Sequence, residues 1–320
     1  MILLLSSQFA GQCASPAESW VSLPGWADEN GFKLVWLRPN ESLALTNQSF
    51  SLSFKTGSTL ALINGVCLWL CDPITQKNGR VCVSSLDLKT SIEPILFPRT
   101  NRVSAGIQTI CLDPGHGGKD TGGEVGRYLE KNYTLPLAEE LAGQFKAKGF
   151  NVMLTRTNDT FIELGNRPGL ADRQKADLFI SLHFNIGPPQ AKGVEVYCLT
   201  PPGANSTNVG KWGYLEGWSA SASLLTGNHC DDQNVLLAYE LQKSLVGNLR
   251  TNDRGLRRAR FAVLRTASMP AVLIEGGFLS DSEDQKKITD PKYRDRIASA
   301  IVQGVLDYQK LSGRQQPNKT

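Results

Sequence analysis

The stretch Ile107–Leu137, IQTICLDPGHGGKDTGGEVGRYLEKNYTLPL, decides the fold of this 320-residue chain. Its first residues, Ile107–Leu112, form a short apolar run that is typical of a buried β-strand. The run stops at Asp113, and the glycines that follow let the backbone turn sharply and leave room above the strand end. His116 falls within this glycine-rich turn. Open loops at strand ends are where α/β proteins usually place their chemistry, so we expect a functional site here.

From residue 107 onward, apolar runs alternate with segments whose apolar residues recur at helical spacing. In the first such segment, residues 130–148, the side chains of Leu137, Leu141 and Phe145 share one face of the predicted helix. Further helices are expected at 163–176, 234–248 and 293–311, and further strands at 151–157, 176–185, 193–200, 261–265 and 270–278. This alternation predicts an α/β fold with a doubly wound, mostly parallel sheet. Residues 201–233, rich in Gly, Ser and Asn, are expected to form either a rim of the active site, which could act as a lid, or a mobile loop.

The first hundred residues differ from the rest in pattern. The apolar start MILLLSSQFA resembles the core of a secretion signal, so residues 1–15 are expected to be a signal-peptide remnant. Residues 16–30 are polar and contain proline, which is typical of a linker. Residues 31–99 hold short apolar runs between turn signals, which predicts a small β-rich module with a structural or targeting role. The α/β domain is then expected over 107–312, with a polar tail at 313–320.

The composition excludes two classes of partner. Hydrophobic residues make up 41% of the chain, but no apolar run approaches twenty residues, which excludes a membrane span within the body of the protein. The net charge of +4 fits attraction to an acidic polymer, yet no basic run or aromatic–basic interleaving indicates nucleic acid. The seven cysteines form no CxxC pair, and the clustering of Cys67, Cys71 and Cys82 allows one disulfide in an oxidising compartment.

Three ionisable residues stand where apolar strands end. His116 follows the first strand, His183 lies at the end of ADLFISLHFN, and Glu275 lies in the strand PAVLIEGGF. Because parallel strands end at the same edge of a sheet, we expect these side chains to meet in one cleft. Each would be costly to bury without a partner, which favours a functional cluster over three separate core residues.

A catalytic zinc site uses three protein ligands, commonly two histidines and a carboxylate, and keeps one position open. His116 and His183 would supply the imidazoles, and the third ligand could be Glu130, Glu124 or His229. Glu275 then remains as the general base that takes a proton from the attacking water.

Several motifs, in order along the chain, resemble the zinc-dependent N-acetylmuramoyl-L-alanine amidases of the family-3 type. They are DPGHGGKDTGG (113–123), LEKN (129–132), TRTND (155–159), the segment around Arg167 with ADLFISLHFN (176–185), KGVEVY (192–197) and PAVLIEGGFLSD (270–281). The resemblance covers about residues 107–310. It implies a six-stranded, mostly parallel sheet flanked by helices, the three-layer fold of amidases and phosphorylases.

The same resemblance assigns roles to residues. In the family, the histidine of the DPGHGG loop, the glutamate of the EKN piece and the histidine of the SLHFN strand bind one zinc ion. These positions are His116, Glu130 and His183 here, which selects Glu130 over Glu124. The catalytic glutamate of the family falls on Glu275.

The implied reaction is hydrolysis of the amide between N-acetylmuramic acid and L-alanine in peptidoglycan. It implies an exported protein of the bacterial periplasm or cell envelope, whose partners are peptidoglycan and a protein activator. Two other functions stay open: a non-catalytic wall-binding or regulatory protein on the same fold, and a zinc peptidase that acts on another amide.

Several further residues are expected near the substrate. Arg167, Asn185, Arg257 and Arg258 could meet substrate carboxylates. Phe184 occupies a place that the family usually gives to a small residue, and it is expected to reshape the substrate cleft.

Overall fold

The computed structural model describes residues 19–99, 106–207 and 223–313. The predicted signal-peptide remnant (1–15), the proposed boundary near residue 100, part of the 201–233 segment and nearly all of the polar tail lie outside these residues. No helix of the described part is long and apolar enough to cross a membrane.

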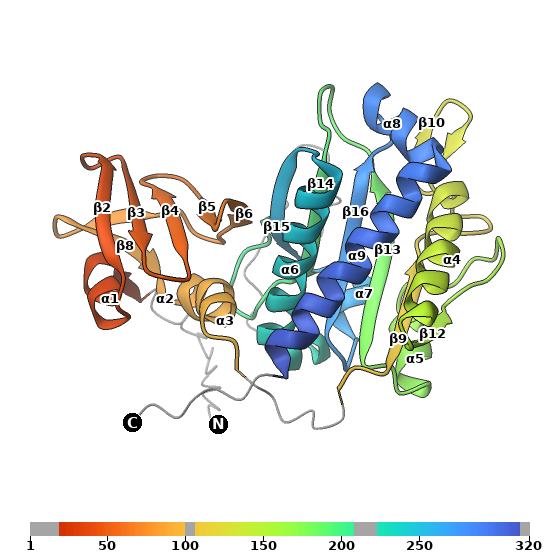
Figure 1. Cartoon of the computed structure of the whole chain (residues 1–320), viewed down its shortest axis with the longest axis horizontal. Helices are drawn as coiled ribbons and strands as arrows, with labels where there is room; N and C mark the ends of the chain where they lie inside the picture. The colour runs from red at the N-terminus through yellow and green to blue at the C-terminus, as the bar shows by residue number, and fades with distance from the viewer. Residues whose placement is uncertain (1–18, 100–105, 208–222, 314–320) are drawn as a thin grey trace, which may run out of the picture.

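One twisted sheet organises the α/β half of the protein (Figure 1). Its strands run in the order β12-β9-β13-β16-β14-β15, and within the described residues only the β14–β16 pair of this set is antiparallel. The strands are β9 (Thr109–Pro114), β12 (Asn151–Leu154), β13 (Leu178–Asn185), β14 (Val194–Leu199), β15 (Asp253–Ala259) and β16 (Ala271–Phe278). The predicted six-stranded, mostly parallel sheet is confirmed.

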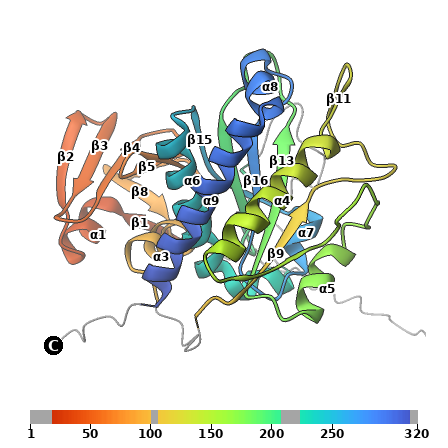
Figure 2. The same ribbon diagram turned by 45° about the vertical axis from the view of Figure 1, so that its right-hand side comes forward.

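Helices cover both faces of this sheet. Helices α4 (Lys131–Ala147), α9 (Pro291–Ser312) and α6 (Asp231–Leu249) lie side by side on one face, as Figures 1 and 2 show. They bury apolar side chains such as Leu141, Leu245 and Ile301 against it. The short helices α5 (Asn166–Arg173) and α7 (Ala262–Arg265) contribute to a second apolar cluster with Phe179 and Leu199, and α8 (Ser282–Thr289) follows β16. Two helical layers therefore enclose the sheet.

The predicted strand at 261–265 is wrong, because Ala262–Arg265 forms the single-turn helix α7. The sheet position beside β14 is already filled by β15 on one side and β16 on the other. β15 itself was not predicted, since its sequence DRGLRRA is polar and lacks the alternation of a half-buried strand.

The predicted linker at 16–30 is also wrong over most of its length. Residues Trp20–Ser22 form β1, and Leu23–Glu29 form helix α1. Leu23, Trp26 and Ala27 recur at helical spacing and are buried, and the proline in the first turn suits a helix start. The segment therefore belongs to the folded N-terminal half.

The rest of that half is a β-meander with a short helical end. Strands β2 (Lys33–Arg38), β3 (Ser42–Thr46), β4 (Ser51–Lys55), β5 (Leu60–Ile63) and β6 (Val66–Trp69) pair antiparallel in sequence order. β1 pairs with β8 (Arg80–Ser84), which pairs with β7 (Thr75–Lys77). Three short helical segments follow: α2 (Ser85–Asp87), η1 (Leu88–Ile92) and α3 (Glu93–Leu96).

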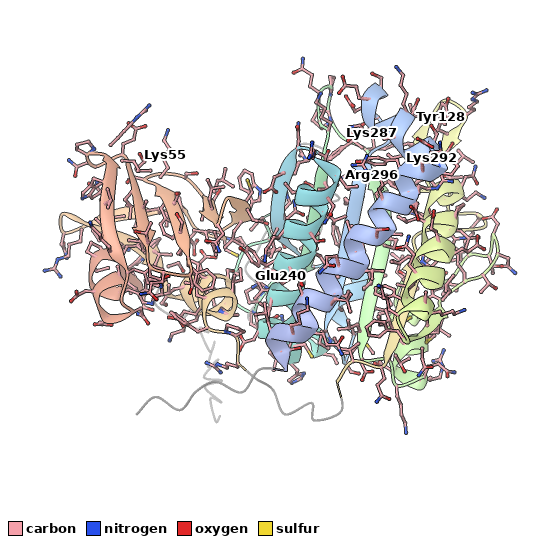
Figure 3. All side chains as sticks on the ribbon, viewed as in Figure 1. Lys55, Tyr128, Glu240, Lys287, Lys292 and Arg296 are labelled. Atoms are coloured by element: carbon pink, nitrogen blue, oxygen red, sulfur yellow. The ribbon has the colours of Figure 1, made fainter. Side chains whose placement is uncertain are left out.

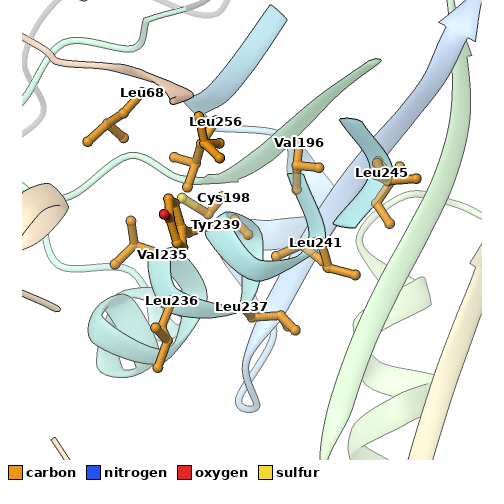
Figure 4. Close-up of a cluster of buried hydrophobic side chains, with 14 of the residues drawn as sticks. Leu68, Val196, Cys198, Val235, Leu236, Leu237, Tyr239, Leu241, Leu245 and Leu256 are labelled. Carbon is orange, nitrogen blue, oxygen red and sulfur yellow. The ribbon is translucent and has the colours of Figure 1, made fainter. Parts of the chain in front are cut away.

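The two halves share a sheet and a core. β6 pairs parallel with β15 through Leu68 and Leu256, so the meander extends the six-stranded sheet to eleven strands among the described residues. Figure 4 shows these two leucines at helix α6 with Cys198, Val235 and Tyr239. The Tyr239 hydroxyl also donates to the Ile63 carbonyl at 3.1 Å. The separation into a 31–99 module and a 107–312 domain stays a prediction.

Candidate metal centre and active site

The loop after β9 carries His116 in a backbone conformation that side chains rarely adopt. Its φ is +62°, and Gly117 and Gly118 continue with φ of +123° and +58°. Such left-handed backbone costs free energy and persists only where surrounding contacts hold it. The Arg167 guanidinium supplies contacts of this kind, because it donates to the carbonyls of Pro114 at 3.0 Å and His116 at 2.9 Å. Hydrogen bonds from Arg167 therefore hold the backbone of this loop in place.

Three predicted side chains meet at the edge of the sheet above this loop. The Glu130 carboxylate lies between the two histidines, with Oε2 3.0 Å from His116 Nε2 and Oε1 2.9 Å from His183 Nδ1. Backbone amides of Gly123 and Phe184 also donate to this carboxylate, at 2.8 and 3.0 Å. Glu130 is only 5% exposed, so its charge is held in a fixed, mostly dry position.

The two other candidates for the third ligand lie elsewhere. Glu124 is exposed in the small hairpin β10 (Glu124–Val125) and β11 (Tyr128–Leu129). His229 is exposed in η2 (Thr226–Cys230), where its Nδ1 lies 3.0 Å from the carbonyl of its own turn. Of the three alternatives, the structure brings Glu130 to the histidines.

The residues present fit a metal ion. One ligand atom from each of His116, Glu130 and His183 lies within 4.8 Å of the others, and the donor set of two imidazoles and a carboxylate suits zinc. The Glu130 oxygens lie 2.9–3.0 Å from the imidazole nitrogens, so the three side chains converge on one region. Asp120 Oδ2 lies 2.9 Å from His116 Nδ1, the carboxylate support that metal-binding imidazoles commonly have.

Two glycines leave the space that this arrangement needs. A Cβ at Gly115 would lie 2.3 Å from His183 Cε1, and a Cβ at Gly122 would lie 2.4 Å from His116 Cδ2. Gly122 also has a φ of +68°. Any larger residue at either position would displace an imidazole, so the glycine-rich sequence is a steric requirement of the cluster.

The cluster shifts the pKa values of its members in opposite directions. Burial opposes a charge on Glu130, but the hydrogen bonds from His116 and His183 outweigh it and hold the Glu130 pKa well below its usual range. Burial likewise opposes a charge on His116, but the bonds to Glu130 and Asp120 raise the pKa of this imidazole. The carboxylate is thus kept ionised.

Glu275 lies on the neighbouring strand, in register with His183. Burial raises its pKa well above the ordinary value, and the charges of Glu130 and Glu195 raise it further. Its Oε2 is buried and has no hydrogen-bond partner within the described residues. An unpaired buried carboxyl oxygen is costly, which makes this atom a candidate for contact with a substrate, a water or a cation.

Sequence reasoning missed Glu195. This residue lies opposite Glu275 in the antiparallel β14–β16 pair, on the side away from His183. Glu195 is 2% exposed and accepts hydrogen bonds from Asn185 at 2.7 Å and Tyr197 at 2.9 Å. Its Oε2 also lies 3.1 Å from Arg254 Nε and 3.0 Å from Arg257 Nε. Its place in the KGVEVY motif was the available signal. Asn185 and Arg257 are therefore near the site, joined to Glu195.

The structure corrects three expectations about residues near the substrate. Arg167 is 1% exposed and pairs with Asp113 at 2.9 Å, so it supports the loop from within and is not open to substrate. Arg258 is fully buried and donates to the Leu199 and Thr90 carbonyls, which places it at the joint between the halves. The Phe184 side chain is fully buried, because neighbouring residues of a strand point to opposite faces and His183 takes the site face.

The predicted disulfide is not formed, since the six cysteines among the described residues are free thiols. Cys13 lies outside the described residues.

A basic hollow of about 440 Å³ lies apart from the residues of the cluster, between the end of α6 and the α8–α9 turn. Figure 3 labels Lys287, Lys292 and Arg296, which line it. Lys286 and Lys287 stand in the last turn of α8, where the helix dipole favours cations. Two of the positive charges of the hollow are therefore stabilised by the helix dipole.

Comparisons with known proteins agree with this geometry. Residues 110–307 match the Amidase_3 family of N-acetylmuramoyl-L-alanine amidases. The chain is 33% identical over 227 residues to the N-acetylmuramoyl-L-alanine amidase AmiA of Escherichia coli (strain K12), an alignment that covers 64% of this chain and 77% of AmiA.

Solved structures show the same relationship. An N-acetylmuramoyl-L-alanine amidase from Clostridium difficile 630 superposes with a TM-score of 0.51 at 33% identity, covering 64% of this chain and 98% of that one. The CwlD amidase from Clostridioides difficile, solved in complex with the GerS lipoprotein, gives a TM-score of 0.52 at 25% identity and covers 63% and 98%. The family model accounts for well over half of the chain, and so this protein belongs to the N-acetylmuramoyl-L-alanine amidase family.

Proposed function

We propose that this protein hydrolyses the amide between N-acetylmuramic acid and L-alanine in peptidoglycan, with one zinc ion as cofactor. His116, Glu130 and His183 would hold the ion, and Glu275 would be the general base. The observation that carries the proposal is the pairing of a His–Glu–His cluster with a buried, unpartnered carboxyl oxygen on the adjacent strand. Membership of the amidase family supports the choice of substrate.

A bound zinc ion would supply Lewis-acid polarisation of the scissile carbonyl and lower the pKa of a coordinated water towards ~7. Asp120 would keep the proton of His116 on Nδ1, which leaves Nε2 free as a ligand. The positive charge of a bound zinc ion would favour the ionised form of Glu275 and offset the burial that raises its pKa. The Glu275 carboxylate would then accept the proton of the attacking water and deliver it to the leaving amine nitrogen. The water oxygen thereby bonds to the carbonyl carbon as the carbon–nitrogen bond breaks.

The family and the predicted signal peptide support an exported protein that acts in the periplasm or cell envelope of a bacterium. One relative is solved with a lipoprotein, and we include a protein activator among the proposed partners of this chain. The N-terminal module is proposed to accompany the zinc domain as a structural unit.

The test is a digest of purified peptidoglycan by the full chain, with and without a zinc chelator. We expect new L-alanine amino termini that disappear with the chelator and return on adding zinc, without new reducing sugar ends. Zinc content measured in Glu130→Gln should fall, while the exposed Glu124→Gln serves as the matched control and should keep the ion. New termini at another residue would favour a zinc peptidase, and binding to peptidoglycan without any product would favour a non-catalytic wall-binding protein.

A further inference from the structure

The N-terminal half places an aromatic side chain beside the active-site edge of the sheet. A groove of about 230 Å³ lies where β6 meets β15, and its lining includes Trp69 from the meander and Arg254 and Arg257 from β15. The Trp69 indole nitrogen donates to the Arg254 carbonyl at 2.7 Å, and the Arg257 guanidinium lies 4.6 Å from the centre of the Trp69 ring. The two halves thus build this groove together.

The close approach of the strands depends on Gly255. Its φ is +91°, and a Cβ there would lie 2.9 Å from the Trp69 ring and 3.0 Å from Cys67. Any other residue would push β6 away and open the groove. The contact is therefore built into the sequence of β15.

The charges in the groove favour an anion. Arg254 and Arg257 share one carboxylate, that of Glu195, which is buried beneath them. Arg254 is 31% exposed, and its two terminal nitrogens make no hydrogen bond to any residue that the structure describes. Asp253 also lines the groove, but its oxygens accept from the amides of Cys67 and Gly255 and from Gln242. Of the other cations in the lining, Lys192 pairs with Glu283 at 2.8 Å and Arg257 donates to the Thr207 carbonyl at 3.3 Å. Arg254 therefore keeps the free N–H groups of the groove.

The position of the groove relates it to the metal centre. The strand register places His183 on β13, Glu275 on β16 and Glu195 on β14 next to one another across the sheet. Glu195 in turn forms an ion pair with Arg254 on β15. Three strand spacings of about 4.8 Å place β15 roughly 14 Å from β13. An extended peptide advances about 3.3 Å per residue, so roughly four residues span this distance.

We propose that this groove is a subsite for a carboxylate of the peptide stem, about three to four residues from the scissile amide, with Trp69 of the N-terminal half as one wall. The inference rests on the proposed amidase function, because that function supplies the stem peptide. Arg254 would donate its free terminal N–H groups to the carboxylate, and the indole of Trp69 would hold the Arg257 guanidinium in place.

The test compares two synthetic muramyl tetrapeptides that differ only in whether the carboxylates beyond the second residue are free or amidated. For the full-length chain we expect kcat/KM to be about tenfold higher for the free acid, a difference carried by KM. In Arg254→Gln and Trp69→Leu this ratio should fall to about one to three. Trp69→Phe keeps the aromatic wall and should restore most of it, and the exposed Arg173→Gln on α5 should leave it as in the parent.

Calorimetric titration of the two free tetrapeptides, without the sugar, gives a second readout that needs no turnover. Equal kcat/KM for both substrates in the parent chain would overturn the subsite while the amidase function stands. An equal fall of kcat on both substrates in Arg254→Gln would also overturn it, because Arg254 would then act through Glu195. If neither substrate is cleaved, the amidase function fails, and the subsite then stands or falls on Arg254-dependent binding of the free acid.

Discussion

The surroundings of two fully buried arginines differ between the α/β half and the joint between the halves. Arg167, beneath the cluster of His116, Glu130 and His183, forms an ion pair with Asp113 and donates to loop carbonyls, so its charge is balanced at contact distance. Arg258, at the joint between the halves, donates to the carbonyls of Leu199 and Thr90 and forms no ion pair within the described residues. Its Nε has no hydrogen-bond partner there. The comparison indicates that the site is held by paired charges, whereas the joint is held by apolar packing around a cation bound to neutral groups.

The largest expected effect is on activity, and it concerns Glu275, whose carboxyl oxygen has no hydrogen-bond partner among the described residues. Glu275→Gln should lower kcat by about 10³-fold, because the amide cannot accept the water proton. Metal content measured by atomic emission should be unchanged, and the melting temperature should be equal or higher, since a carboxyl near Glu130 and Glu195 is removed. Glu124→Gln, at an exposed position of the hairpin, should keep full activity. Loss of the metal in Glu275→Gln would contradict the assignment of this residue as a base.

The second effect tests the paired charge. Arg167→Met should reduce the free energy of unfolding by about 3–5 kcal/mol, because Asp113 would remain buried without its partner. Denaturant titration would measure this loss, and Arg173→Gln on the same helix should change stability by less than about 0.5 kcal/mol. A loss below about 1 kcal/mol for Arg167→Met would show that the loop does not depend on this ion pair.

Arg258→Met gives the matched result for the joint. Here no carboxylate in contact loses its partner, and the main cost is the unsatisfied carbonyls of Leu199 and Thr90, about 1–2 kcal/mol. The same denaturant titration applies. A loss equal to that of Arg167→Met would erase the contrast between the regions and indicate that Asp87 and Asp231 pair with Arg258 over a longer distance.

The smallest effect is a pH dependence that arises at the joint. Burial raises the pKa of Asp87 to about 6, although the amides of Cys71 and Asp72 oppose the shift. The folded state therefore binds this proton more tightly than the unfolded state, so its contribution is present at low pH and is lost as the pH rises through about 6. We expect unfolding at pH 5 to cost about 1 kcal/mol more than at pH 7 from this group.

Comparing the parent with Asp87→Asn at both pH values isolates the contribution of Asp87. The contributions of the other ionisable groups are common to both proteins and cancel in the difference. Asp28→Asn, on α1, is the control. An identical pH dependence in the parent and Asp87→Asn would show that Asp87 titrates at its ordinary pKa in the folded protein.

Local sequence predicted the meeting of the two histidines, but not every residue around them. The strand ends, the glycine spacing and the order of the motifs predicted a sheet edge where His116 and His183 meet, and the family resemblance selected Glu130. Strand alternation alone would have directed the Phe184 side chain to the buried face, opposite His183. The resemblance to the family instead led to an expectation based on the size of this residue. Arg167 was misplaced for a related reason, since sequence alone does not separate a guanidinium that binds a ligand from one that binds backbone.

The joint could not be predicted in this way. β15 carries three arginines in seven residues, so its sequence lacks the apolar pattern of a strand. It is a strand because it pairs with its neighbours, among them β6 through Leu68. That contact joins residues far apart in the chain, and no periodicity signals it. α1 was hidden because its seven residues are too few for a clear helical pattern.

The extension of the sheet also changes which strand forms one of its two edges. One edge is β12, and adding the meander to β15 makes β2 the other, a strand that pairs only with β3 among the described residues. Val35, Trp36 and Leu37 are 37–59% exposed on this strand. Unpaired edge strands with apolar side chains invite a second chain to dock, and charges beside them discourage it. Lys33 and Arg38 are the first and last residues of β2, so charges flank its apolar side chains as they commonly flank exposed edge strands.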